Sequence, residues 1–448
     1  MRSRSLEADV VRTSECGNAA SKRPPSRSPL LGLDDDEPWL TAIETFRTRN
    51  PRRVDRLDAY DSLIIQGAHQ RAAAAVLEGR YQPGPPREAS LNKLDGRKKR
   101  VFQYEPIDEL LFRVVNHMLQ PIAAEAASPW CRSFLPGGGA RAAFRAVIVD
   151  RDLASKSALR LDVRDYFNSI DVADLMTRLP DPFTTGSVGA LLSRSLFDRR
   201  IVRGSSVVDD EQKGVMAGTP LAPLLATLYL SDLDREVVSC GATYSRYSDD
   251  ILALASPDAL PALESMIRAR LRERGLDVNE GKSSVVGPGE PWDFLGFRYH
   301  ADRISLAAVT EHKFKARSTR LARGLMRWRE QTGASRERTL RAFFRRTNRR
   351  LYGIASERAD FSWATWFLPM LDTPDGLAPL DHHVQREARY AATGRRTPRT
   401  RGEVPYADLT GAGHVPLVSS YWKLRETRVR GEPQRLERAL LEPCRRAR

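Results

Sequence analysis

The chain has 448 residues, 41% hydrophobic and 29% charged, which is typical of a soluble globular protein with two or three domains. Its net charge of +15 favours a polyanionic partner such as a nucleic acid, although the Arg-rich composition of a GC-rich genome is an alternative explanation. The four cysteines are scattered without a CxxC spacing, which argues against a zinc site or a disulfide framework and suits a reducing cytosol. With neither an apolar run of about 18 residues nor a signal-peptide core, we expect a cytoplasmic protein without a membrane span.

The N-terminal region predicts a tail followed by helices. Residues 1–36 are rich in Ser, Arg and Pro and poor in apolar residues, so we expect a disordered tail. Helices are predicted over residues 38–47 and 60–77, and Gly79 suits the end of the second. Residues 107–120 carry apolar residues at helical spacing and predict a core helix.

A basic hairpin is predicted between these helices. Asp95-Gly96 is a strong turn signal between two short strands, and residues 97–100, all basic, leave the turn on the second strand. Alternate residues of a strand face opposite sides, so Lys98 and Arg100 share one side. The pattern leaves open which side faces a ligand, and a solvated basic surface is the alternative interpretation.

The middle of the chain begins with a short apolar strand at residues 159–163 that contains Asp162. A Gly/Pro loop at residues 214–223 follows, and it runs into an apolar helix predicted over residues 224–233. Asp165 lies three positions after Asp162, so we expect it to point elsewhere.

An adjacent pair of aspartates forms the centre of the pattern. Residues 243–247 and 251–254 read as two strands of a hairpin, with Ser248, Asp249 and Asp250 at its tight turn. Two neighbouring carboxylates repel each other unless a cation neutralises them. Mg²⁺ prefers oxygen ligands, and two such ions can clamp a nucleotidyl transfer. Taken alone, a solvated Ser-Asp-Asp turn without chemistry is the alternative.

Beyond the hairpin the chain becomes increasingly basic. A basic amphipathic helix is predicted over residues 261–274, and a second hairpin over residues 292–299. Residues 311–350 hold fourteen Lys and Arg against three acids, with apolar residues at helical spacing, which predicts two or three basic helices that bind nucleic-acid phosphates. His382 and His383 have no spaced partner and do not predict a metal site.

The strand with Asp162, the loop with Gly218, the Asp249-Asp250 turn, Lys282 and residues 292–297 occur in the order of motifs A to E of reverse transcriptases, which they resemble. The resemblance covers roughly residues 90–300. It implies an α+β right-hand polymerase with fingers, an antiparallel palm sheet and a helical thumb, plus a helical C-terminal extension. The expected domains are a tail (1–36), N-terminal helices and fingers (37–157), palm (158–304), thumb (305–352) and extension (353–448).

The resemblance also implies site residues. Asp162, Asp249, Asp250 and the backbone at Val163 would hold two Mg²⁺ ions, with Mn²⁺ as an alternative, and Lys282 would be a general acid for the departing pyrophosphate. A surface role for Lys282 is the alternative. Phe167 would be a steric gate that favours deoxynucleotides, or only a core residue. The implied nucleotide contacts are Lys98, Arg100, Asp165, Tyr166, Phe167 and Gly218, and the implied primer or template contacts are Tyr247, Phe294, Leu295 and Gly296.

The expected function is RNA-directed DNA synthesis from an RNA template, which could be a dedicated noncoding RNA, with a DNA or protein primer and dNTPs. Most reverse transcriptases have glutamine where this chain has Ala217, a departure that favours the defence-associated, abortive-infection-like bacterial branch. Three alternatives stay open: a group II intron or retron-type enzyme, an untemplated or protein-primed DNA polymerase, and a non-catalytic RNA-binding scaffold. Homo-oligomer formation is also left open.

Overall fold

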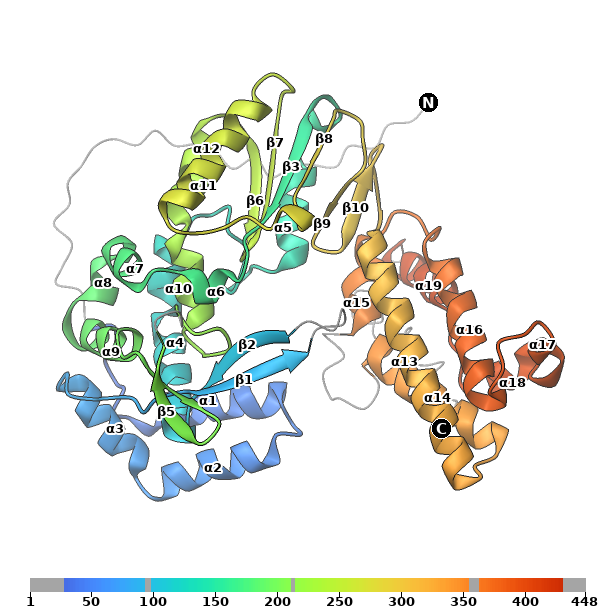
Figure 1. Ribbon diagram of the computed structural model, residues 1–448, viewed down its shortest axis with the longest axis horizontal. Coiled ribbons are helices and arrows are strands. Elements are labelled where there is room, and N and C mark those ends of the chain that lie inside the picture. The colour runs from blue at the N-terminus through green and yellow to red at the C-terminus, as the bar shows by residue number, and fades with distance from the viewer. Residues whose placement is uncertain (1–27, 93–97, 211–213, 354–361, 430–448) are drawn as a thin grey trace.

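The structure, a computed structural model, describes residues 28–92, 98–210, 214–353 and 362–429. Figure 1 shows a mixed α+β molecule with N-terminal helices and a small sheet on one side, a central sheet, and a helical C-terminal region. The turn predicted at residues 95–96 and most of the predicted tail lie outside the described residues. Leu30 and Leu33 are fully buried, so the tail prediction is wrong for residues 28–36.

The N-terminal helices are α1 (Asp36–Arg49), α2 (Val54–Ile65), α3 (Ala68–Leu77) and α4 (Pro106–Ala126), and the first three pack around the apolar face of α4. The single helix predicted over residues 60–77 is wrong, because Gly67 adopts φ 62° and separates α2 from α3. Glycine reaches this left-handed conformation without the steric penalty of a Cβ atom.

A four-stranded sheet in the order β2-β1-β4-β5 forms the fingers. Its predicted hairpin is confirmed in its strands, β1 (Arg87–Asn92) and β2 (Lys98–Gln103), which pair antiparallel. Two strands that we did not predict, β4 (Arg200–Arg203) and β5 (Ser206–Asp209), extend it, and β4 runs parallel to β1. Residues 200–209 therefore belong to the fingers sheet rather than to the palm, where the predicted boundaries placed them.

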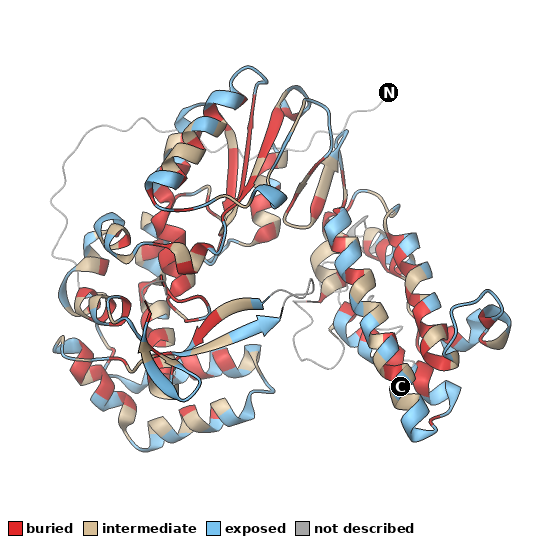
Figure 2. Cartoon of the chain, in the orientation of Figure 1, coloured by how far each residue is buried: buried red, intermediate tan, exposed pale blue. Residues whose placement is uncertain are grey.

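The central palm sheet has the order β6-β7-β3-β8 and is antiparallel throughout. Its strands are β3 (Ser157–Asp162), β6 (Thr243–Tyr247), β7 (Asp250–Ala255) and β8 (Ser284–Val286). The central strands β3 and β7 are buried along almost their whole length, as Figure 2 shows. A sheet covered on both faces produces such near-continuous apolar strands, and this explains the short apolar runs in the sequence.

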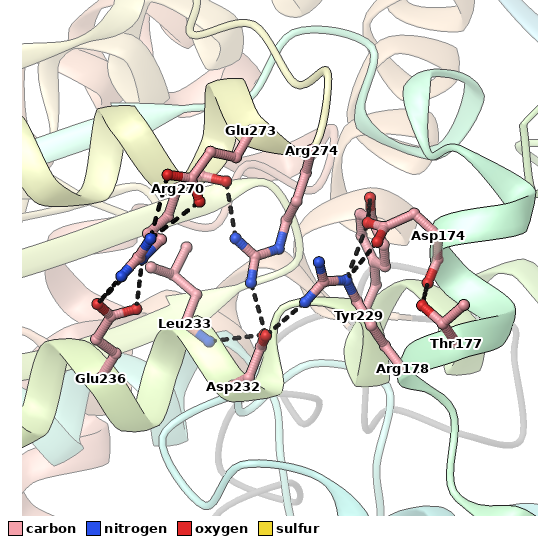
Figure 3. A network of polar contacts seen from close by, with 10 residues as sticks. All are labelled: Asp174, Thr177, Arg178, Tyr229, Asp232, Leu233, Glu236, Arg270, Glu273 and Arg274. Carbon is pink, nitrogen blue, oxygen red and sulfur yellow. Dashed lines mark hydrogen bonds and ion pairs between the residues drawn. The ribbon is translucent and has the colours of Figure 1, made fainter.

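Helices cover the palm sheet. They include α5 (Ala140–Ile148), α10 (Ala222–Tyr229), α11 (Ser231–Ser239) and α12 (Leu260–Glu273). Ion pairs join α11 to α12 and its C-cap: Asp232 pairs with the buried Arg274, which follows α12, and Glu236 pairs with Arg270 (Figure 3). The short segments between the main elements are η1 (Leu153–Ser155), α6 (Tyr166–Ser169), α7 (Val172–Arg178), α8 (Asp181–Thr184), α9 (Gly186–Leu196) and η2 (Glu280–Lys282).

A three-stranded sheet leads from the palm into the thumb. It consists of β9 (Trp292–Phe294), β10 (Phe297–His300) and β11 (Arg303–Leu306), and the predicted hairpin is confirmed as β9–β10. The two long basic helices that follow are α13 (Ala308–Thr332) and α14 (Arg336–Tyr352).

The C-terminal extension is helical, as expected, and its longest helices are α16 (Leu377–Thr393) and α19 (Leu417–Val429). Because α16 packs against both α13 and α14, the thumb and the extension share one apolar core. Its shorter helices are α15 (Trp363–Phe367), η4 (Leu368–Met370), α17 (Thr400–Glu403) and α18 (Tyr406–Gly411). Among the described residues, no helix combines the length and apolar character needed to cross a membrane.

Candidate active site

Three aspartates stand at one end of the palm sheet. Asp162, the last residue of β3, lies directly opposite Asp250, the first residue of β7. The amide of Val163 donates to the carbonyl of Asp249 at 2.9 Å, so the turn is bonded to the end of β3. The cross-strand neighbour of Asp162 is therefore Asp250, because Asp249 remains in the turn. Strand register thus brings together carboxylates that are far apart in the sequence.

A buried ion pair lies behind this turn. Arg246 of β6 and Asp234 of α11 are fully buried, and two guanidinium nitrogens donate to the two carboxylate oxygens at 2.7 and 2.8 Å. Arg246 also donates to the carbonyl of Ser248 at 3.3 Å and to that of Thr227 at 2.9 Å. Ser248 adopts φ 61°, which side-chain-bearing residues rarely do, so Arg246 fixes the one strained residue of the turn.

In front of the turn, the carboxylate of Asp162 is already neutralised. Lys282 donates to its two oxygens at 2.8 and 2.7 Å, and Asn279 donates to one of them at 3.0 Å. Asp250 in turn accepts from Arg160 at 3.0 Å. Burial, followed by the negative charges of Asp250 and then Asp162, raises the pKa of Asp249 to about 6. Mutual repulsion of this kind characterises carboxylates gathered for a cation.

The basic hairpin places Lys99 next to the site, and not Lys98 or Arg100, the two residues that we predicted. Arg100 forms ion pairs with Glu88 and with the buried Asp210 inside the fingers sheet, and Lys98 is exposed at the start of β2. Lys99 instead has its ammonium 5.6 Å from the ring centre of Phe167 and lowers the pKa of Asp249 slightly through its charge. The period of two along β2 explains the difference, because Lys99 points to the opposite side from Lys98 and Arg100.

The segment after Asp162 forms a compact turn. Asp165 adopts φ 42°, and its carboxylate accepts from the side chain of Asn168 at 3.2 Å. The Tyr166 side chain is buried and donates to the carbonyl of Ala226 at 2.6 Å, so its hydroxyl is directed into the core. Phe167 is half-buried.

The loop with Ala217 and Gly218 is bonded to the fingers. The Ala217 amide donates to the Asn168 side chain at 3.0 Å, and its carbonyl accepts from the amide of Phe102 at 2.7 Å. Gly218 has φ 99°, and a Cβ atom there would lie 3.1 Å from the Phe102 carbonyl oxygen. The glycine therefore permits the close approach of the loop to β2.

The residues predicted to hold the primer divide into two kinds. Phe294 is fully buried in the core, whereas Tyr247 and Leu295 are half-buried. Gly296 has φ 90°, and its carbonyl accepts from the Thr310 hydroxyl at 2.8 Å, which fixes the β9–β10 turn against α13. Phe294 thus acts through packing, and the turn itself faces the cleft described below.

A comparison with known protein families gives a match over the segment that contains the three aspartates and Lys282. Residues 97–299 match the family model described as reverse transcriptase (RNA-dependent DNA polymerase). This segment is a reverse transcriptase domain. A search of curated proteins gave no match.

Among solved structures, the chain is similar to an apo telomerase from Candida Tropicalis truncated from its C-terminal domain, with 10% sequence identity and a TM-score of 0.41. The similar region covers 50% of this chain and 56% of the telomerase chain, so it spans little more than half of that structure.

A cleft of about 1690 Å³ lies between the reverse transcriptase domain and the thumb. Its floor includes Asp162, Asp250 and Lys282, and the β9–β10 turn forms part of its wall. Its thumb side carries Arg317, Arg346 and Arg350, for which the described residues provide no ion pair. Desolvation, and then repulsion from Arg317, lowers the pKa of Arg350. Cations that crowd one another at a wall without countercharge suit a polyanionic ligand.

Reverse transcriptase domains use divalent metal ions, and the acids at this site fit them only in part. Within the described parts of the chain, no three His, Cys, Asp or Glu side chains lie close enough together to hold a metal ion. The donors are nevertheless hard carboxylate oxygens, the kind that Mg²⁺ prefers. Burial, and then repulsion from Asp250 and Asp162, raises the pKa of Asp249, and a cation would relieve that repulsion. Lys282 occupies both oxygens of Asp162 and would have to leave them for a metal.

Sequence reasoning missed three parts of this site: Lys99, the Arg246–Asp234 pair and the ring of Phe134, which contacts Phe167. A signal existed for one of them. Arg246 stands in the predicted strand next to the paired aspartates, and a charge in a buried strand requires a partner.

Proposed function

We propose that this chain is an RNA-directed DNA polymerase that extends a primer by metal-assisted nucleotidyl transfer. The observation that carries the proposal is the register that brings Asp162, Asp249 and Asp250 to one end of the palm sheet, where Asp162 and Asp250 line the floor of a cleft with a cationic wall. Acids at the floor suit cations, which in turn would bind a triphosphate, and the cationic wall suits a nucleic-acid duplex.

Asp162 and Asp249, supported by Asp250 and the Val163 backbone, would hold two Mg²⁺ ions, or Mn²⁺. Bound there, the ions would activate a primer hydroxyl and neutralise the charge that develops on the phosphates. Arg246 and Asp234 keep the turn with Asp249 in place behind the site. Preorganised charge of this kind contributes more to such reactions than any single base.

Lys282 has two roles in this proposal. Without metal, its ammonium neutralises Asp162 at 2.7 Å. Once displaced from that carboxylate, it would be free to donate a proton to the departing pyrophosphate. Lys99, beside Phe167 and near Asp249, is the fingers residue best placed to contact the triphosphate.

A second candidate function, untemplated or protein-primed DNA synthesis, rests on Ala217. Its buried methyl group stands where most reverse transcriptases have a glutamine side chain, and its backbone is already bonded to Asn168 and Phe102. The position can therefore hold the loop against β2 but offers no side-chain hydrogen bond to a nucleotide or a template base.

The test is primer extension with dNTPs and Mg²⁺ on an RNA template, beside a reaction without template or primer. We expect template-directed extension by the wild type and none by the Asp249→Ala/Asp250→Ala double variant. Asp258→Ala, which removes an exposed acid shortly after β7, is the matched control and should extend normally. Product in the reaction without template would support the second candidate, and inactivity on both synthetic and co-purified RNA would favour a non-catalytic scaffold.

We further propose that the enzyme serves in bacterial defence against phage, with a dedicated noncoding RNA as template. The departure at Ala217 from the usual glutamine is what supports this setting. Bacteria that express the wild type should form fewer phage plaques than bacteria that express the double variant. Equal plaque numbers across a broad set of phages would contradict the defence role without affecting the polymerase proposal.

A further inference from the structure

Phe134 lies in the loop between α4 and α5 and has two unusual properties. Its backbone adopts φ 58°, in the left-handed region, although it is not a glycine. Its large apolar ring is 39% exposed. Strained residues of this kind persist where the surroundings hold them in place, and they concentrate at functional sites.

The segment before Phe134 is bonded to the catalytic hairpin. Cys131 forms a β-bridge with Arg246, and the amide of Arg132 donates to the Arg246 carbonyl at 3.1 Å. The next residue, Ser133, accepts at its hydroxyl from the amide of Ser248 at 3.1 Å. Phe134 therefore follows directly after a residue bonded to the Asp249 turn, and its position relative to the three acids is fixed.

The ring of Phe134 contacts two other rings of the site. Its centre lies 6.2 Å from that of Phe167 in a T-shaped arrangement and 6.0 Å from that of Tyr247. Phe167 also has the Lys99 ammonium 5.6 Å from its ring centre. Contacts of this geometry stabilise one orientation of a half-buried aromatic ring.

We propose that Phe134 is a positioning residue for Phe167 and thereby sets how strongly the enzyme prefers deoxynucleotides to ribonucleotides. The inference rests on the proposed function and on the steric-gate role that the family resemblance implies for Phe167, whose ring would face the sugar of the incoming nucleotide. A ring excludes a 2′-hydroxyl only if it cannot turn aside, and a half-buried ring needs a neighbour to prevent that. Phe134, itself held by the loop bonded to the catalytic turn, blocks this movement.

The experiment measures single-nucleotide incorporation with a dNTP and the matching rNTP and compares the ratio of their kcat/KM values. We expect Phe134→Ala to reduce the ratio about two- to tenfold, the effect of losing an aromatic pair, mainly by improving use of the rNTP. Phe167→Ala should reduce it further. The double variant should resemble Phe167→Ala alone, because both changes act on the same ring. Phe134→Tyr keeps the ring contact and should restore the wild-type ratio.

The control is Phe197→Ala, which removes an exposed phenylalanine of the fingers and should leave the ratio unchanged. An unchanged ratio in Phe134→Ala would overturn this proposal, whether the two kcat/KM values stay the same or fall by the same factor. An equal fall would indicate that Phe134 stacks on a base. If the wild type incorporates dNTPs, only this proposal fails in those cases. A wild type that incorporates neither nucleotide would overturn the proposed function as well.

Discussion

The palm and the helical C-terminal region each contain buried aspartates, and their partners differ. In the palm, the fully buried Asp234 has a bidentate guanidinium partner, and the buried Asp162 has Lys282 and Asn279. In the C-terminal region, the buried Asp381 has no ion pair within the described residues, and it accepts from the backbone amides of Leu417 and Val418 at 2.7 and 3.1 Å.

The two regions also differ in whether their charged side chains form ion pairs. On α11 and α12 of the palm, acids and arginines form the ion-pair network of Figure 3. On α13 and α14, the cleft-facing Arg317, Arg346 and Arg350 have no ion pair within the described residues. The palm is therefore organised before ligands arrive, because its geometry must be exact at the reacting atoms, whereas the thumb keeps positive charge available for a polyanion.

The largest effect should come from removing the buried partner in the palm. Asp234→Ala leaves Arg246 charged and buried without its countercharge, and breaking such a pair typically costs about 3–5 kcal/mol. We expect the free energy of unfolding, measured by urea denaturation, to fall by that amount. The rate of extension should also fall, because Arg246 holds the Ser248 carbonyl in the catalytic turn.

Glu236→Ala is the matched control for that change, since Glu236 lies on the same helix and its pair with Arg270 is partly exposed. Exposed pairs contribute about 0–1 kcal/mol, so this variant should unfold almost like the wild type. Similar destabilisation by the two substitutions would contradict the contrast between the buried and the surface pair.

An intermediate effect is expected from Asp381, whose pKa burial raises to about 6. Because the folded state holds this proton more tightly than the unfolded state, the contribution of Asp381 to stability is largest near pH 4 and is lost as the pH rises to about 6. A shift of this size corresponds to about 2–3 kcal/mol. We expect the free energy of unfolding of the wild type, relative to Asp381→Asn, to decline across this range.

The comparison with Asp381→Asn is needed because burial lowers the pKa of the nearby His414 to about 4. The unfolded state binds that proton more readily, so stability from His414 rises with pH over much of the same range. A constant difference between wild type and Asp381→Asn from pH 4 to pH 7 would show that Asp381 does not titrate in this range.

The smallest effect is expected from a single thumb arginine. Arg350→Gln should weaken binding of an RNA–DNA duplex and reduce the slope of log K against log salt by about one, the change for one phosphate contact. Arg341→Gln is the control, because Arg341 lies on the same helix but pairs with Glu337 outside the cleft. Equal slopes for wild type and Arg350→Gln would contradict the assignment of the cleft wall to phosphate binding.

Much of this protein follows from local sequence pattern. The hairpin with Asp249 and Asp250, the basic strand, the β9–β10 hairpin and the basic thumb helices were predicted because their signals are local: paired aspartates at a turn, alternation along a strand and apolar residues at helical spacing. The order of the acidic and glycine-rich motifs was enough to suggest the family that the comparison gives.

Only the tertiary structure decided which side chains meet. Strand register placed Asp250, not Asp249, opposite Asp162, and the parity of β2 turned Lys99 rather than Arg100 towards Phe167. The addition of β4 to β1 moved residues 200–209 into the fingers. The docking of the loop with Phe134 onto β6 also has no local signal, because it depends on backbone hydrogen bonds between segments far apart in the chain. Pairing between distant strands is set by how their faces bury together, and a sequence read in windows does not contain that information.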